Sequence, residues 1–121
     1  NFVAKALALP NETMRKRAIE GLFGGWSQAN LESSAKALDT MERGELRDIA
    51  VVQFVENARW ADREAAMTWA FEVSDAAKQR ATVLDQGRRW LNADREAATK
   101  WIQSNETLPE EWRTELLKAK K

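Results

Sequence analysis

Residues 61–69 read ADREAAMTW, and residues 93–101 read ADREAATKW. The two stretches lie 32 residues apart, and a further step of 32 residues before Asp62 reaches Asn30, which begins a degenerate copy, NLESSA. A fixed period of roughly 20–50 residues indicates stacked supersecondary units, each of which needs a neighbour to bury its apolar face. The sequence therefore predicts a repeat architecture with a period of about 32 residues.

Each copy of this motif has the features of a helix N-terminus. Asp62 and Asp94 can accept hydrogen bonds from backbone N–H groups that have no intrahelical partner. Glu64 and Glu96 follow two residues later, where a negative charge complements the helix dipole. Paired carboxylates could also serve acid–base hydrolysis, but residues two apart on a helix point in different directions. The pattern therefore favours capping over catalysis.

Apolar periodicity predicts eight helices, longer and shorter in alternation. They cover about residues 2–9, 11–26, 30–41, 44–60, 62–73, 74–92, 94–104 and 109–118. Short turns make sequential helices antiparallel neighbours. We therefore expect an all-α fold, a right-handed α-solenoid of antiparallel helix hairpins that share one continuous apolar core. The chain, 1–121, would be a single α-helical repeat domain and a segment of a longer protein.

Three glycines lie in the second of these helices, at Gly21, Gly24 and Gly25. A glycine-rich loop can cradle a phosphate, but no Lys-Ser/Thr follows this one and no strand precedes it, so neither phosphate motif is met. Close approach of two helices, or early fraying of the helix, is the favoured interpretation.

A partial resemblance to a known family appears in the second half of the repeat. Ala97-x3-Trp101 followed by Pro109 resembles the second half of a tetratricopeptide repeat, and Ala65-x3-Trp69 gives the same pair without the proline. The first-helix signature of that family is absent; its positions hold Ala81, Leu84, Asp85 and Arg88. The recurring D-x-E-A-A-x-x-W also resembles tandem repeats of uncharacterised bacterial proteins. The resemblance implies helical hairpins over residues 11–118 and no activity.

Composition narrows the classes of function. Nineteen basic residues balance nineteen acidic ones, so the net positive field that drives nucleic-acid binding is missing. Cysteine, histidine and tyrosine are absent, which removes thiolate chemistry and the commonest general base and transition-metal ligand. No apolar run is long enough to span a membrane. We therefore expect no metal, no cofactor and no nucleic-acid partner, and the composition is compatible with both cytoplasm and periplasm.

Six tryptophans are the most unusual feature of the composition. Trp69 and Trp101 are 32 residues apart, and Trp26 and Trp90 are 64 apart. Packing between units recurs with the period, whereas a single ligand site does not, so we expect these four in the core. Trp60 and Trp112 lie off the period and are the better candidates for exposed, functional aromatics.

The function is inferred from this architecture. In solenoids the first helix of each unit commonly lines an extended concave surface that suits protein or peptide partners. We therefore predict a non-enzymatic helical-repeat module for protein or peptide interaction. Two alternatives are a structural spacer or self-associating scaffold, which would form homo-oligomers, and a carboxylate-dependent helical hydrolase. The candidate partner-binding residues, polar and on the longer helices, are Arg15, Arg47, Asn57, Gln79, Gln86 and Arg89.

Overall fold

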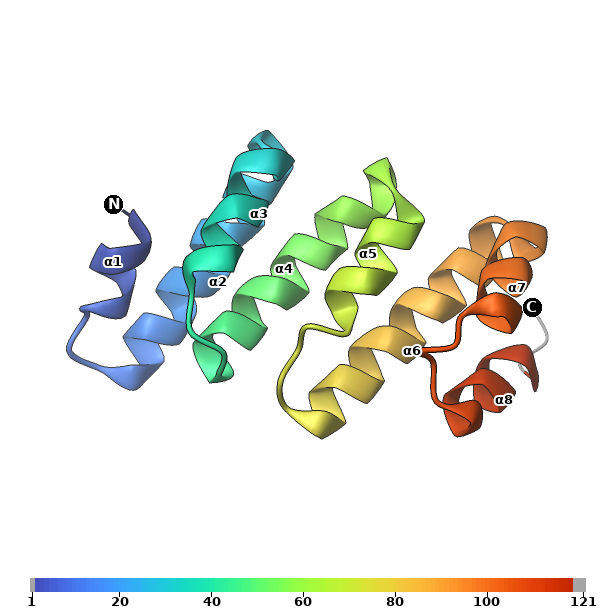
Figure 1. The fold of residues 1–121 in the computed structure, drawn as a ribbon. Coiled ribbons are helices and arrows are strands. Elements are labelled where there is room, and N and C mark those ends of the chain that lie inside the picture. The colour runs from blue at the N-terminus through green and yellow to red at the C-terminus, as the bar shows by residue number, and fades with distance from the viewer. Residues whose placement is uncertain (1, 119–121) are drawn as a thin grey trace.

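The computed structural model describes residues 2–118, and this part of the chain forms eight α-helices and no strand (Figure 1). The helices are α1 (Phe2–Leu7), α2 (Glu12–Ala29), α3 (Leu31–Thr40), α4 (Glu45–Ala61), α5 (Arg63–Ala70), α6 (Ala76–Ala93), α7 (Arg95–Ser104) and α8 (Glu110–Lys118). The all-α prediction is confirmed. The second helix does not fray at its glycines but continues three residues past Trp26, and the fifth ends at Ala70, three residues before Val73.

Six of the helices pair as hairpins, α2–α3, α4–α5 and α6–α7, here called hairpins 1, 2 and 3. A single residue joins the helices of each pair: Asn30, Asp62 and Asp94 respectively. Its side chain accepts a hydrogen bond from the N–H three residues later and so caps the second helix. Its own N–H donates to the carbonyl four residues earlier and closes the first helix. The predicted caps are confirmed, and each has this additional role.

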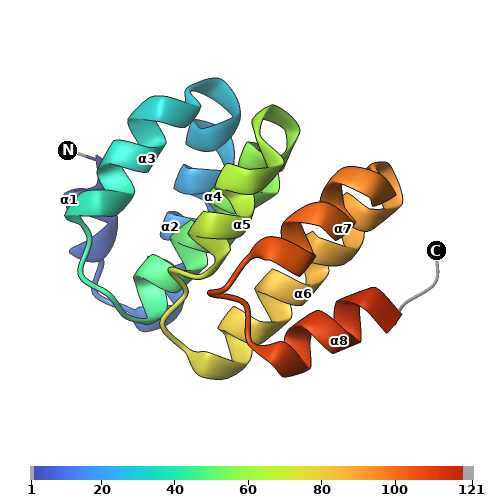
Figure 2. The same cartoon turned by 45° about the vertical axis from the view of Figure 1, so that its right-hand side comes forward.

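The hairpins are arranged in two rows. The first helices, α2, α4 and α6, lie side by side in one row, and α3, α5 and α7 lie along the other (Figures 1 and 2). Helix α1 packs on α2, and α8 packs on both α6 and α7. None of the helices between Phe2 and Lys118 is long and apolar enough to cross a membrane.

A recurring hydrogen bond ties each first helix to the segment before it. Near the start of α2, α4, α6 and α8, a long polar side chain donates to a backbone carbonyl at or just beyond the end of the preceding helix. Carbonyls in the last turn of a helix lack the N–H partner four residues later that earlier carbonyls have. The four donors and acceptors are Arg15 Nη1 to Leu9 (2.7 Å), Arg47 Nε to Leu38 (3.0 Å), Gln79 Nε2 to Phe71 (2.8 Å) and Arg113 Nε to Ile102 (3.0 Å). We call them the connecting hydrogen bonds.

The buried core is divided into two clusters, which corrects the prediction of one continuous core. The first cluster spans α1 to α5 and includes Phe23, Val51 and Val55, all fully buried. The second spans α5 to α8 and includes Ile102 and Leu116. Helix α5 contributes to both clusters, so it is the element that joins the two halves of the molecule.

Polar contacts lie between the two clusters, where α4 and α6 face each other. Helix α4 packs far less closely on α6 than it does on α2. The carboxylate of Glu56 on α4 accepts a hydrogen bond from Gln86 (3.1 Å) and forms an ion pair with Arg89 (3.4 Å) on α6. Buried Asp48 on α4 accepts from the backbone N–H groups of Ser74 (2.7 Å) and Asp75 (3.1 Å) before α6. A polar boundary therefore replaces apolar packing between these two helices.

Two glycine substitutions test how closely α6 and α8 approach. A Cβ at Gly21 would meet nothing within 4 Å, whereas one at Gly87 would lie 2.9 Å from Cδ2 of buried Leu116. Alanine in place of a helical glycine gains roughly 1 kcal/mol, and overpacking a core costs roughly 1–3 kcal/mol. We expect Gly21→Ala to raise the free energy of unfolding by about 1 kcal/mol and Gly87→Ala to lower it by up to about 2 kcal/mol. Urea unfolding followed by circular dichroism measures both, and equal stabilisation would contradict the close α6–α8 contact.

Candidate functional site

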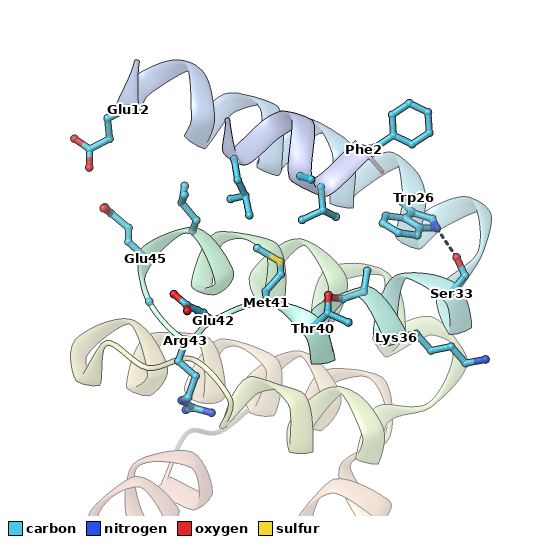
Figure 3. Close-up of a pocket in the computed structure, with 16 residues that line it drawn as sticks. Phe2, Glu12, Trp26, Ser33, Lys36, Thr40, Met41, Glu42, Arg43 and Glu45 are labelled. Carbon is cyan, nitrogen blue, oxygen red and sulfur yellow. Dashed lines mark hydrogen bonds between the residues drawn. The ribbon is translucent and has the colours of Figure 1, made fainter. Parts of the chain in front are cut away.

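An open groove of about 1120 Å³ lies between α1 and α3 (Figure 3). Helix α2 and the first turn of α4 contribute its remaining walls. The apolar side chains that line it come from four helices and the turn after α3: Val3, Leu7, Trp26, Ala37, Met41 and Leu46. We call this cavity the α1–α3 groove. Its volume is slightly above the roughly 300–1,000 Å³ of typical ligand pockets, as suits an extended ligand such as a peptide.

Charged side chains are distributed unevenly along this groove. Glu12, Glu42 and Glu45 line one end together with Arg43, which pairs with Glu72 at 3.1 Å. Lys36 lies toward the other end, where Trp26 is also found (Figure 3). Glu45 forms an ion pair of 3.0 Å with Lys16. The hydrogen bond and charge of Glu45, with the charge of Glu12, raise the pKa of the Lys16 ammonium. Glu42 and Lys36 form no ion pair with another described residue, so each is free to meet a partner's charge.

The groove is open at Ala37, where the other two hairpins have tryptophan. Trp69 and Trp101 stand 32 and 64 residues after Ala37. Trp69 packs against Phe54 with ring centroids 5.2 Å apart, and Trp101 against Trp90 at 5.8 Å. Each of the two therefore lies beside an aromatic ring of the first helix of its own hairpin, and both are partly buried against a core cluster. At Ala37 the large side chain is missing and the space is part of the groove.

The end of the groove beside Ala37 is held in place by a hydrogen bond. The indole Nε1 of Trp26 donates to the hydroxyl of Ser33 at 2.6 Å (Figure 3). This contact links α2 to α3 across the corner at Asn30. It leaves one edge of the Trp26 ring on the cavity wall, where it provides a rigid apolar surface for a ligand.

Three of the predicted partner-binding residues make the connecting hydrogen bonds. Arg15, Arg47 and Gln79 each donate to the carbonyl of the preceding segment, as described above. Arg47 is only 5% exposed and also contacts Glu72 (3.4 Å) and the ring of Trp69. A partner could not reach Arg47 in this conformation, and reversing its charge would test folding rather than binding.

The other three predicted residues lie between neighbouring first helices. Asn57 Nδ2 donates to the carbonyls of Gly24 (3.4 Å) on α2 and Gln53 (3.1 Å) on its own helix. Gln86 and Arg89 both contact Glu56 across the polar boundary, and Gln86 is 2% exposed. All six predicted residues therefore make internal contacts. The prediction that Arg15, Asn57, Gln79 and Arg89 bind a partner stays a prediction.

The two tryptophans that lie off the period differ in exposure. Trp60 is 71% exposed, which confirms its predicted exposure, and its functional role stays a prediction. Trp112 is half-buried and stacks on Phe71 with centroids 6.1 Å apart and planes inclined by 12°. It packs against the second core cluster, so the predicted exposure of Trp112 is wrong.

The chemistry that this groove supports is recognition of an apolar, partly charged surface. Within residues 2–118 no group of three Asp or Glu side chains is placed to hold a metal ion.

The residues that form the groove were not among those predicted from the sequence. One signal was available: Ala37 interrupts a series of tryptophans at a spacing of 32 residues, and a missing large side chain leaves a cavity in a packed structure.

Comparison with known proteins adds no relative to this picture. No protein family matches the chain, and no match is found among curated proteins or solved structures.

Proposed function

We propose that the chain is a non-enzymatic helical-repeat module that binds a protein or peptide partner in the α1–α3 groove. The helices would form a right-handed α-solenoid of tetratricopeptide-like hairpins, in which each hairpin buries its apolar face against the next. The observation that carries the proposal is Ala37, which keeps open a space at the position where the two later hairpins have tryptophan.

The exposed apolar side chains beside the groove support this proposal. Phe2 is 73% exposed and Leu7 is 39% exposed, and both line the cavity. Exposed apolar side chains that gather at a concave site and are rimmed by polar groups are typical of interaction surfaces. Val3, Ala37 and Met41 extend the same surface into the groove.

The partner that suits this groove is an amphipathic helix. Such helices bind by laying an apolar stripe, one residue every three or four positions, into an apolar groove between helices. The acidic end at Glu12 and Glu42 would pair with basic residues of that helix, and Lys36 at the other end with an acidic one. The bound helix would lie between α1 and α3.

Ala37→Trp tests the proposal by introducing the residue of the other two hairpins. The indole should fill the groove without unfolding the chain, because Trp69 and Trp101 occupy the same place in their hairpins. A peptide selected from a displayed library of helical sequences should bind the original chain, and Ala37→Trp should weaken binding by about tenfold or more. Fluorescence anisotropy with the labelled peptide measures the dissociation constant.

The matched control is Ala81→Trp, which adds the same side chain at an exposed position of α6 far along the chain. It should leave peptide binding unchanged. Circular dichroism should show the same helix content in all three proteins. Failure to select any peptide, or equal binding by Ala37→Trp, would contradict the proposal.

A second candidate function, a self-associating scaffold segment, is favoured by the outer face of α2. On α4, Gln53 lies against Gly24 and Asn57 donates to its carbonyl. Gly21 and Gly25 are the residues of α2 that stand 32 positions before Gln53 and Asn57. Both are exposed, and a Cβ added at either would have no atom within 4 Å. Together with Met14, which is 47% exposed, they leave a face without bulky side chains at these two glycines, which another helix could approach closely.

Met14→Lys tests this second candidate, because Lys78 is the residue 64 positions later in the chain. If copies associate through the outer face of α2, two buried lysines would oppose each other and the dissociation constant should rise by about tenfold or more. Sedimentation equilibrium at several concentrations measures this dissociation constant. The control is Thr114→Lys, at an exposed position of α8. A monomer at every concentration of the original chain would exclude self-association.

A further inference from the structure

Trp60 belongs to neither core cluster, so packing of the core does not account for an aromatic residue at this position. It lies near the end of α4 and is 71% exposed. The residues 32 positions before and after it are Gln28 and Asn92, so neither neighbouring hairpin uses an aromatic here. Two guanidinium groups face the ring, with Cζ of Arg59 4.1 Å and Cζ of Arg63 5.7 Å from its centroid. The exposed indole is therefore held in one orientation by cation–π contacts.

The guanidinium of Arg63 has no anionic partner among the described residues. Its Nη1 is buried and makes no hydrogen bond, and no described carboxylate forms an ion pair with it. Burial, followed by the positive charges of Arg59 and Arg89, lowers the pKa of Arg63. Buried donors of charged groups are almost always paired. The charge of the Arg63 guanidinium, a residue that is itself only partly buried, is therefore left without a partner in the described chain.

The neighbouring arginines differ from Arg63 because they have internal partners. Glu56 forms ion pairs with Arg59 (3.7 Å) and Arg89 (3.4 Å), and Asp85 forms another with Arg89 (3.1 Å). Their charges are therefore largely balanced, and Arg63 remains the one uncompensated cation of this cluster. One free positive charge matches a single carboxylate. The nearby acidic groups would repel a polyanion such as a nucleic acid.

A small cavity adjoins Trp60. It measures about 420 Å³ and is lined by Ser27, Gln28, Leu31, Asn57, Trp60 and Ala61. The hydroxyl of Ser27 is buried and has no hydrogen-bond partner among the described residues. A cavity lined by both apolar and polar side chains suits a peptide, one side chain of which can fill it. None of these residues lines the α1–α3 groove.

We propose that Trp60 and Arg63 form a second binding site, which takes an acidic peptide segment. A glutamate or aspartate carboxylate of that segment pairs with the guanidinium of Arg63, and charge-assisted pairs of this kind are strong when partly buried. An adjoining apolar side chain covers the indole of Trp60 and enters the small cavity. The site is separate from the α1–α3 groove, so either site can exist without the other.

Nuclear magnetic resonance on the labelled chain tests the site with a short synthetic peptide that alternates glutamate with leucine. The indole N–H resonance of Trp60, identified by its loss in Trp60→Asn, should shift and saturate as the peptide is added. Arg63→Gln should weaken binding by about tenfold or more. Added salt should weaken binding to the original chain, because the carboxylate pair is partly screened.

The chain provides its own matched control. Arg95 has the same flanking residues as Arg63, Asp before and Glu after, but it is exposed and has Asn92 in place of the tryptophan. Arg95→Gln should leave binding unchanged. The proposal would be overturned if Arg95→Gln weakens binding as much as Arg63→Gln, or if a peptide with glutamine in place of glutamate binds equally well. It would also be overturned if inorganic phosphate shifts the Trp60 resonance at the same concentration, since the site would then bind simple anions.

Discussion

The structure depends on a corner of one residue that ends one helix and begins the next. Asn30, Asp62 and Asp94 have nearly the same backbone conformation, with φ between −159° and −152°. Each satisfies one backbone donor with its side chain and one backbone acceptor with its own N–H. A connection this short leaves the two helices little freedom to separate, so they must pack on each other. The rows of first and second helices follow from repeating this one geometry.

Much of the fold could be predicted because its determinants are local. The caps at Asp62 and Asp94 involve residues three positions apart, and the period of 32 residues gave the pairing of the helices. The connecting hydrogen bonds could not be assigned from residue type, because Arg15, Arg47 and Gln79 resemble surface residues until their long-range acceptors are known. Their spacing of 32 residues was a sign of a structural role, since a contact between units recurs with the period and a single binding site does not.

The candidate sites were predicted less well than the fold. Trp60 was singled out because it breaks the period, and its exposure follows from the lack of any helix packed over it. The α1–α3 groove depends on a side chain that is small, at Ala37, and on how α1 lies relative to α3. Arg63 has the same sequence neighbours as Arg95. What separates them is the burial of Arg63, Arg59 four residues before it in place of Leu91, and the approach of Arg89 in space. The local sequence does not encode the approach of Arg89.

The polar boundary between α4 and α6 has a mechanical consequence. Apolar cores resist shear because any displacement opens voids, whereas ion pairs at half-exposed positions exchange with water at little cost. Glu56 and Arg89 are of this half-exposed kind. Bending of the molecule should therefore concentrate at this boundary, with α5 as the pivot. The α1–α3 groove, formed entirely within the first half, would keep its shape while the far half swings.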